Sequence, residues 1–264
     1  MLGLVYGCAA PEVPEAPEVP EALGGRFIAH YGAATAEYND FRANLIANRF
    51  LDTVAARLND SLRLPSDVTL ATAHCDQPNA SYNPSQQRVT LCYELFKGLS
   101  ERFDQEVGGE YLIMGTLMFA LMHELGHGLI DVLALPVTGR EEDAVDQLAT
   151  ILLLNQGATG DSLAFGAVGW FASNAGSNQL DDLALADDHG LDRQRVYNII
   201  CWIYGRDPAR YPEVASEGWL PPHRARGCSD EYQRLRSSWA RLLAPHRKGP
   251  EASGLFPDSN PGAA

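Results

Sequence analysis

Two histidines and a glutamate stand at a spacing that can hold and use a metal ion. His123, Glu124 and His127 form the pattern His-Glu-x-x-His in the segment HELGH. Residues four apart share one face of an α-helix, so both imidazoles can reach one ion. Glu124 directly follows the first histidine and can take a proton from a metal-activated water. The pattern therefore predicts a hydrolytic zinc (Zn2+) site with Glu124 as its general base.

Apolar residues surround this motif and favour the metal site over an accidental match. The alternative is an amphipathic surface helix that happens to present histidine and glutamate. Inside an apolar stretch, however, two unpaired histidines and a glutamate are expensive to bury. The apolar neighbours are Leu121, Met122, Leu125, Leu129 and Ile130. We therefore expect a buried helix over residues 111–133 that carries the motif.

A third protein ligand is expected after the motif, because catalytic zinc sites use three. The metzincin pattern requires Gly at position 130 and His at position 133, but the chain has Ile130 and Leu133. Glu142 and Asp146 instead form a Glu-x-x-x-Asp pattern, the gluzincin arrangement. There the glutamate binds zinc and the aspartate orients a zinc-bound histidine. Glu142 is thus the predicted ligand and Asp146 the predicted orienting residue. The alternative is a solvated acidic helix start, which the helix dipole favours.

The neighbouring acid, Glu141, is expected to serve its own helix. Residues 138–141 read Thr-Gly-Arg-Glu, a capping-box pattern with Thr138 as N-cap and Glu141 at N3. Position 145 is valine, so Glu141 has no carboxylate one turn later. We therefore predict a backbone role for Glu141 and a metal role for Glu142.

The elements that position these residues are predicted to form a mostly helical α+β domain with a small sheet. Helices are expected over residues 27–64, 94–107, 111–133, 138–155, 192–204 and 229–243, with partial helix over 156–178. Strands are expected over 68–73 and 88–93, and Pro78, Asn83 and Pro84 mark a turn region between them. The strand over 88–93 is a candidate to line the cleft and pair with an extended peptide.

The two ends of the chain differ from this domain. Residues 10–22 read APEVPEAPEVPEA, a Pro/Glu-rich spacer that cannot bury apolar area. Cys8 precedes it in a segment that resembles a bacterial lipobox but lacks basic residues and is short for a signal peptide. The alternative is a terminus with a chance cysteine. We expect a lipobox-like N-terminus and disordered spacer over 1–25, the metallopeptidase domain over 26–248 and a disordered tail over 249–264.

Charge and cysteine content restrict the partners and the compartment. The formal net charge of −14 opposes binding to nucleic acid and to anionic lipid. Cys75 and Cys92 flank a predicted hairpin, and Cys201 and Cys228 bracket a Pro/Gly-rich stretch. Disulfides Cys75–Cys92 and Cys201–Cys228 would leave Cys8 unpaired and would indicate an oxidising compartment. The alternative is a set of separate reduced cysteines in the core.

The chain resembles a bacterial family of metallopeptidase domains whose substrate is not established. The resemblance covers roughly residues 26–246. It is carried by LCYEL at 91–95, HELGHGLIDVLALPVTGREEDAVDQLA at 123–149, RQRVYN at 193–198, CWIYG at 201–205 and WARLLAPH at 239–246. The resemblance implies a secreted or periplasmic zinc protein with a compact gluzincin-like fold.

A more distant similarity to thermolysin implies that a later histidine or tyrosine stabilises the oxyanion. His189 is the candidate for this catalytic role, because the neighbouring Asp187 and Asp188 would keep it protonated. The alternative is a histidine in a surface loop. Tyr197 and Tyr204 are further candidates, although such tyrosines more often pack in the core with a hydrogen-bonded hydroxyl.

The function predicted from the sequence is hydrolysis of peptide bonds by a zinc metallopeptidase. The expected partner is a peptide or protein substrate, with no nucleic acid, and a lipid on Cys8 would tether the protein to the cell envelope. The expected location is secreted or periplasmic. Two alternatives stay open: a non-catalytic zinc-bearing protein of the cell envelope, and an amidase acting on a non-protein amide.

Overall fold

The structure, a computed structural model, describes residues 24–175 and 187–249 of the 264-residue chain. Cys8 with its lipobox-like neighbours and the Pro/Glu-rich residues 10–22 lie outside the described residues, as does the expected tail beyond residue 249. Every helix and strand given below falls within residues 26–248.

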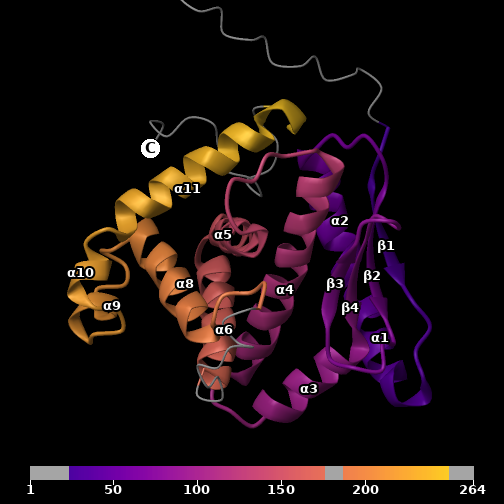
Figure 1. Cartoon of the computed structure of the whole chain (residues 1–264). Helices are drawn as coiled ribbons and strands as arrows, with labels where there is room; N and C mark the ends of the chain where they lie inside the picture. Colours follow the sequence, from indigo (N-terminus) through magenta and orange to yellow (C-terminus); the bar gives the residue numbers. More distant parts are fainter. Residues whose placement is uncertain (1–23, 176–186, 250–264) are drawn as a thin grey trace, which may run out of the picture.

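The described residues form a mostly helical α+β fold with one four-stranded sheet, which confirms the predicted fold class (Figure 1). The strands are β1 (Phe27–Tyr31), β2 (Val68–Ala73), β3 (Ala80–Asn83) and β4 (Arg88–Cys92). The longer helices are α1 (Asn39–Ala47), α2 (Phe50–Ser61), α3 (Tyr93–Phe103), α4 (Gly109–Val132), α5 (Glu141–Leu154), α6 (Gly157–Asn174), α8 (Asp192–Arg206) and α11 (Cys228–Leu243). Short helices are η1 (Ala36–Tyr38), α9 (Glu213–Ser216), α10 (Pro222–Ala225) and η2 (Ala244–His246).

The sheet has the order β1-β2-β4-β3, in which β1, β2 and β4 run parallel and β3 runs antiparallel to β4. The strand predicted over 68–73 is β2, and the one predicted over 88–93 is β4, which ends one residue earlier. The antiparallel pair between Cys75 and Cys92 is the hairpin β3–β4. Strand β3 falls in the expected turn region, because its four residues alternate between half-buried and exposed and include no apolar run. Its strand conformation comes from pairing with β4.

The prediction of one helix over residues 27–64 is wrong at the start and in the middle of this range. Phe27–Tyr31 is strand β1, which pairs with β2 and buries Phe27. The side-chain amide of Asn59 in α2 holds this strand through two hydrogen bonds. It accepts one from the backbone N–H of Phe27 and donates one to the backbone carbonyl of Phe27. The remaining helical part is divided into α1 and α2 at Arg49, whose φ of 51° is left-handed and cannot continue a helix.

Helix α4 lies between the sheet on one side and helices α5, α6, α8 and α11 on the other (Figure 1). It crosses α6 with the two backbones in contact, which is possible because Gly115 and Gly166 carry no side chain. A Cβ atom at Gly115 would lie 2.3 Å from the carbonyl oxygen of Leu163, and one at Gly166 would lie 2.0 Å from that of Tyr111. This close crossing fixes α6 beside the half of α4 that precedes the His-Glu-x-x-His motif.

By length and composition, α4 is also long and apolar enough to cross a membrane. In the structure, however, 67% of its most apolar window is buried against the rest of the protein. The helix expected over residues 111–133 is therefore found as a core helix, with nearly the same bounds.

Both predicted disulfides are present. Cys75 and Cys92 join the loop after β2 to the end of β4, with 5.5 Å between their Cα atoms. Cys201 and Cys228 join α8 to the start of α11, with 5.1 Å between their Cα atoms. The alternative of separate reduced cysteines is therefore wrong for these four residues.

Candidate metal centre

The two histidines of the motif share the face of α4 that is turned toward α5. Their ring centroids are 5.0 Å apart, and the side chain of His123 is almost fully buried. Gly126, between them, allows α5 to approach, because a Cβ atom there would lie 2.8 Å from Val145. Val145 is flanked on α5 by the acids that face the histidines. The glycine of HELGH thus brings the second helix within reach of the first.

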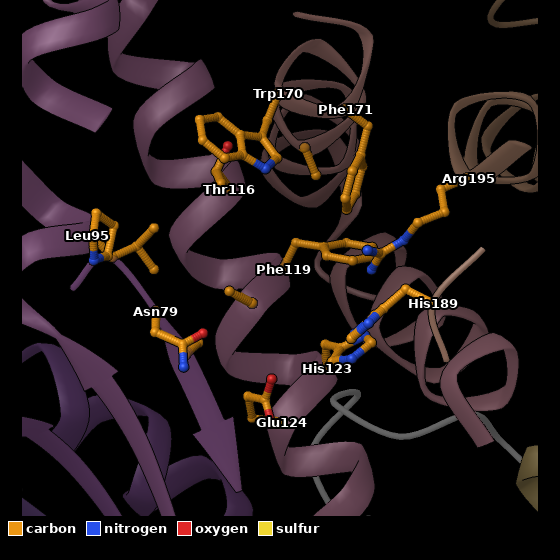
Figure 2. A pocket seen from close by; sticks show the side chains of 14 residues that line it. Asn79, Leu95, Thr116, Phe119, His123, Glu124, Trp170, Phe171, His189 and Arg195 are labelled. Carbon is orange, nitrogen blue, oxygen red and sulfur yellow. The ribbon is translucent and has the colours of Figure 1, made fainter. Parts of the chain in front are cut away.

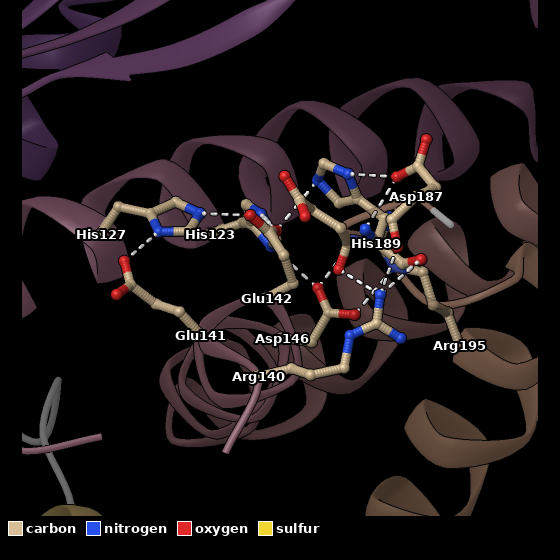
Figure 3. A network of polar contacts seen from close by, with 10 residues as sticks. His123, His127, Arg140, Glu141, Glu142, Asp146, Asp187, His189 and Arg195 are labelled. Atoms are coloured by element: carbon tan, nitrogen blue, oxygen red, sulfur yellow. Dashed lines mark hydrogen bonds and ion pairs between the residues drawn. The ribbon is translucent and has the colours of Figure 1, made fainter. Parts of the chain in front are cut away.

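Glu142 reaches both histidines from α5. Its Oε2 atom lies 3.0 Å from Nε2 of His123, and its Oε1 atom lies 3.4 Å from Nε2 of His127 (Figure 3). One ligand atom from each residue lies within 4.8 Å of the other two. The structure therefore brings together the three residues that the sequence analysis proposed as ligands.

The geometry of these atoms fits a divalent cation. Oε2 of Glu142 is buried, and no hydrogen bond of good geometry reaches it from the described residues, although ring nitrogens lie close to it. In a tetrahedral site with bonds of about 2.0–2.1 Å, ligand atoms are about 3.3 Å apart. The observed separations, 3.0 Å from Oε2 to His123 and 3.4 Å from Oε1 to His127, lie on either side of this value. Two imidazoles and one carboxylate are also a common donor set for catalytic zinc.

A second carboxylate lies behind each histidine. Asp146 Oδ1 is 2.8 Å from Nδ1 of His123, and Glu141 Oε1 is 2.7 Å from Nδ1 of His127. Each carboxylate can accept a hydrogen bond from Nδ1–H, which leaves the Nε2 lone pair of the ring directed toward Glu142. The position of Asp146 is the one expected of an orienting residue.

The backbone role predicted for Glu141 is wrong. Helix α5 begins at Glu141 itself, with Arg140 as N-cap and no capping hydrogen bond from a side chain. Thr138 and Gly139 stay outside the helix, so the capping-box register does not exist. The Glu141 side chain turns to His127 instead. The sequence analysis missed Glu141 as a partner of the histidines. The capping-box pattern had assigned its carboxylate to a backbone N–H at the start of its own helix.

Arg195 on α8 completes the network; it stands in RQRVYN, one of the segments that carry the family resemblance, but the sequence analysis gave it no role. Its Nε and Nη2 atoms donate to both oxygens of Asp146 at 2.8 and 2.7 Å, and its guanidinium stacks 4.1 Å from the ring centroid of Phe171. The fork geometry fixes the carboxylate that orients His123. Burial raises the pKa of Asp146, but His123 and Arg195 outweigh this and hold that pKa below its ordinary value.

Charge around the centre is dominated by carboxylates. Burial lowers the pKa of His127, but the carboxylates of Glu142 and Glu141 outweigh this and raise it to about 9. Burial raises the pKa of Glu124 above its ordinary value, and the neighbouring His123 and His127 oppose this. A carboxyl group with this tendency suits a residue that accepts and later returns a proton. Glu124 contributes no ligand atom to the cluster of three.

His189 reaches the centre from the segment before α8. Its Nε2 atom lies 2.9 Å from Oε2 of Glu142, and its ring stacks on that of His123 with centroids 5.8 Å apart. Asp187 accepts from the backbone N–H of His189 at 2.8 Å and lies 3.3 Å from its Nδ1. Arg140 donates to the carbonyl of Asp188 at 2.6 Å and so ties this segment to α5. His189 is therefore at the site, half exposed, and its role as oxyanion donor stays a prediction.

The two tyrosines considered for the same role lie elsewhere. Tyr197 and Tyr204 are partly buried and pack against the hydrophobic core. Neither side chain lines the two cavities described beside the centre. The structure thus supports core packing for both.

Two cavities meet at the centre, and Glu124 and His189 line both. One, of about 280 Å³, runs between α3, α4 and α6 (Figure 2). The other, of about 730 Å³, runs along β3 and the start of α5. Strand β4 was expected to line the cleft with a free edge, but it is paired on both sides, to β2 and to β3. The edge strand at the cleft is β3, which was not predicted as a strand.

A comparison with protein families finds a match over most of the chain. Residues 31–243 match the family model "DUF4344: Putative metallopeptidase". A search of curated proteins and a search of solved structures find no match.

Proposed function

The chain belongs to the DUF4344 family of putative metallopeptidases, and on this premise we propose that it is a zinc-dependent peptidase. The observation that carries the proposal is the convergence of His123, His127 and Glu142, with Glu124 beside them and not among the ligand atoms. A merely structural zinc site is closed by four protein ligands, whereas a catalytic one keeps a position open. Three ligands at the meeting point of two cavities fit the catalytic case.

His123, His127 and Glu142 would hold the ion, and Asp146 and Glu141 would keep the two imidazoles oriented through Nδ1. A bound zinc ion would supply Lewis acidity toward the scissile carbonyl and a nucleophilic water at neutral pH. Glu124 would accept the proton of the attacking water on its carboxylate and pass it to the leaving amine. His189 would donate a hydrogen bond from Nε2 to the oxygen that develops negative charge.

The substrate proposed is a peptide or protein segment in extended conformation. Strand β3 is an edge strand, and Asn79, Ala80, Ser81 and Tyr82 line the larger cavity. A peptide can add to such an edge through main-chain hydrogen bonds, which recognise any sequence. The cleft would thus hold the backbone of the substrate on β3 and present one peptide bond to Glu124.

We further propose that the protein works in an oxidising compartment, either secreted or periplasmic. This proposal is supported by the two disulfides, because disulfides form and persist in oxidising environments outside the cytosol. Attachment to the cell envelope through a lipid on Cys8 remains part of this proposal. Mass spectrometry of the protein purified from its native membrane fraction would identify a lipid on Cys8, and recovery of unmodified soluble protein would count against the tether.

The proposed function is tested by the variant Glu124→Gln, which removes the base and leaves the three ligands intact. We expect folded protein with full zinc content and no hydrolysis of a generic peptide mixture. The matched control is Glu110→Gln, because Glu110 is an exposed acid in the first turn of the same helix. The control should cleave like the wild type, and a chelator should stop both active proteins.

Two results would count against this assignment. Loss of zinc from Glu124→Gln would show that Glu124 is a ligand and that its role is misassigned. Retention of zinc by the wild type without any chelator-sensitive hydrolysis would favour the non-catalytic alternative or a non-peptide amide substrate. Assay of the same proteins on peptidoglycan fragments would separate these two.

A further inference from the structure

The smaller cavity beside the centre is mainly apolar at the end away from the metal ligands. It is bounded by α3, α4 and α6, and Figure 2 shows Trp170 and Phe171 at the end opposite Glu124. The apolar wall residues are Leu95, Phe119, Ala120, Ala167, Trp170 and Phe171. Aromatic contacts fix this end: Phe119 and Phe171 meet edge to face at 5.5 Å, and Trp170 meets Phe103 at 6.2 Å. The cavity therefore has a defined shape.

Apart from the neutral side-chain amide of Asn79, the polar groups that border this cavity are already engaged. The hydroxyl of Thr116 donates to the carbonyl of Leu112 in the preceding turn at 2.7 Å. The positive charge of Arg195 is matched by Asp146 through two hydrogen bonds. His123, Glu124 and His189 belong to the metal centre at the open end. A charged side chain that entered the apolar end would lose its hydration without gaining a partner of opposite charge, whereas an apolar side chain would lose nothing.

We propose that this cavity is the specificity pocket of the enzyme and receives a bulky apolar side chain, such as leucine or phenylalanine, from a residue next to the scissile bond. This inference rests on the proposed peptidase function. Continuity with the centre carries it, since the same cavity is lined by His123, Glu124 and His189 at one end and by Trp170 and Phe171 at the other. Its volume of about 280 Å³ lies just below the range of about 300–1,000 Å³ that holds small-molecule ligands, which suits one side chain.

Ala120 offers a direct way to close the pocket. It lies on α4 one turn before His123, is half-buried and lines the cavity. Leucine at this position extends into the cavity and keeps a high helix propensity, so the helix and the metal ligands should be unaffected. Ala120→Val is a smaller change for use if the leucine variant unfolds. The matched control is Ala158→Leu, an exposed alanine near the start of α6 that does not line either cavity of the site.

The experiment compares pairs of fluorogenic peptides that differ only in one residue beside the cleaved bond, which is located first by mass spectrometry. For the wild type and Ala158→Leu, we expect kcat/KM to be at least about tenfold higher for leucine or phenylalanine than for alanine or aspartate. For Ala120→Leu, we expect this ratio to fall to near one while cleavage of the alanine peptide persists. Cleavage that depends on Glu124 but shows no such preference, or an unchanged ratio in Ala120→Leu, would overturn the proposal.

A binding measurement keeps the pocket testable if hydrolysis itself is absent. In Glu124→Gln, titration with acetylated leucine or phenylalanine amide, followed by Trp fluorescence and calorimetry, reports occupation of the cavity lined by Trp170. We expect the apolar amides to bind at least about tenfold tighter than the aspartate amide, and Ala120→Leu to abolish the difference. Absence of hydrolysis with this binding pattern would reject the peptidase function alone. Equal binding of all amides would reject the pocket.

Discussion

The Oδ1 atom of Asp146 lies 2.8 Å from Nδ1 of His123, which leaves Nε2 of that ring free to face the metal centre. Both side chains are buried, so their relative position is fixed by packing as well as by this contact. Arg195 donates hydrogen bonds to both oxygens of the same carboxylate. The orientation of one candidate ligand is thus set by a chain of contacts that links α4, α5 and α8.

Asp146→Asn should weaken zinc binding by about 10–100-fold, because the amide orients His123 less firmly and leaves the charge of Arg195 unmatched. The measurement is competition for zinc with a chromophoric chelator. Asp143→Asn is the matched control, since Asp143 lies in the first turn of the same helix and is not part of the cluster. Equal loss of affinity in the two variants would mean that the effect comes from helix charge and not from orientation of the ligand.

Glu142→Ala should purify without zinc, because two histidines alone form a much weaker site. Metal analysis after gel filtration gives the result directly, and circular dichroism should show that the helices are kept. Asp143→Ala serves again as the control that keeps its zinc. Full zinc content in Glu142→Ala would show that another residue supplies the third ligand, and the assignment of the centre would then be wrong.

Glu141→Ala should lower zinc affinity by about tenfold or more, since Glu141 lies 2.7 Å from Nδ1 of His127. An acid that merely began the helix would cost only about 1 kcal/mol of stability and leave the metal in place. The two roles are separated by measuring zinc affinity and thermal unfolding on the same sample. A loss of stability with unchanged zinc affinity would restore the simpler role for Glu141.

The disulfide between α8 and α11 should contribute about 3.5 kcal/mol to the free energy of unfolding, as expected for a bridge with a sequence separation of 27. The double variant Cys201→Ala and Cys228→Ala tests this by urea unfolding without reductant. Peptide mapping of the non-reduced wild type should recover Cys75–Cys92 and Cys201–Cys228 as linked pairs. A bridge to Cys8, or free thiols at the other four positions, would contradict the pairing.

Glu94 should make the stability of the fold depend on pH in the acid range. Burial raises its pKa, but its own backbone N–H, the N–H groups of Cys75 and Asp76 and the nearby His74 outweigh this and hold the pKa below its ordinary value of 4.5. Because the folded-state pKa is the lower one, the stabilisation is present above pH 4.5 and is lost as the pH falls below it. The difference in thermal unfolding between Glu94→Gln and the wild type should therefore be largest at pH 7 and shrink as the pH falls below 4.5. A difference that does not change with pH would show that the charge of Glu94 is not involved.

The sequence alone determined the parts of this protein that depend on local spacing. A helix brings residues four apart to one face, so the segment HELGH is sufficient to pair the two histidines. The apolar run around it predicted a core helix, and α4 has that place. β-branched and apolar runs likewise predicted β2 and β4. In each case the information lies within one element.

The tertiary structure decided what depends on the meeting of separate elements. Arg195 reaches Asp146 from 49 residues away, and the short strand β3 exists because β4 is beside it. Glu141 was assigned a capping role from its neighbours, but the approach of α5 to α4 at Gly126 gave it His127 as a nearer partner. Hydrogen bonds and close packing act over a few ångströms of space, whereas a local pattern records only distance along the chain. The three candidate ligands and Asp146 could thus be predicted from the sequence, but the contacts of Glu141 and Arg195 and the pocket beside them could not.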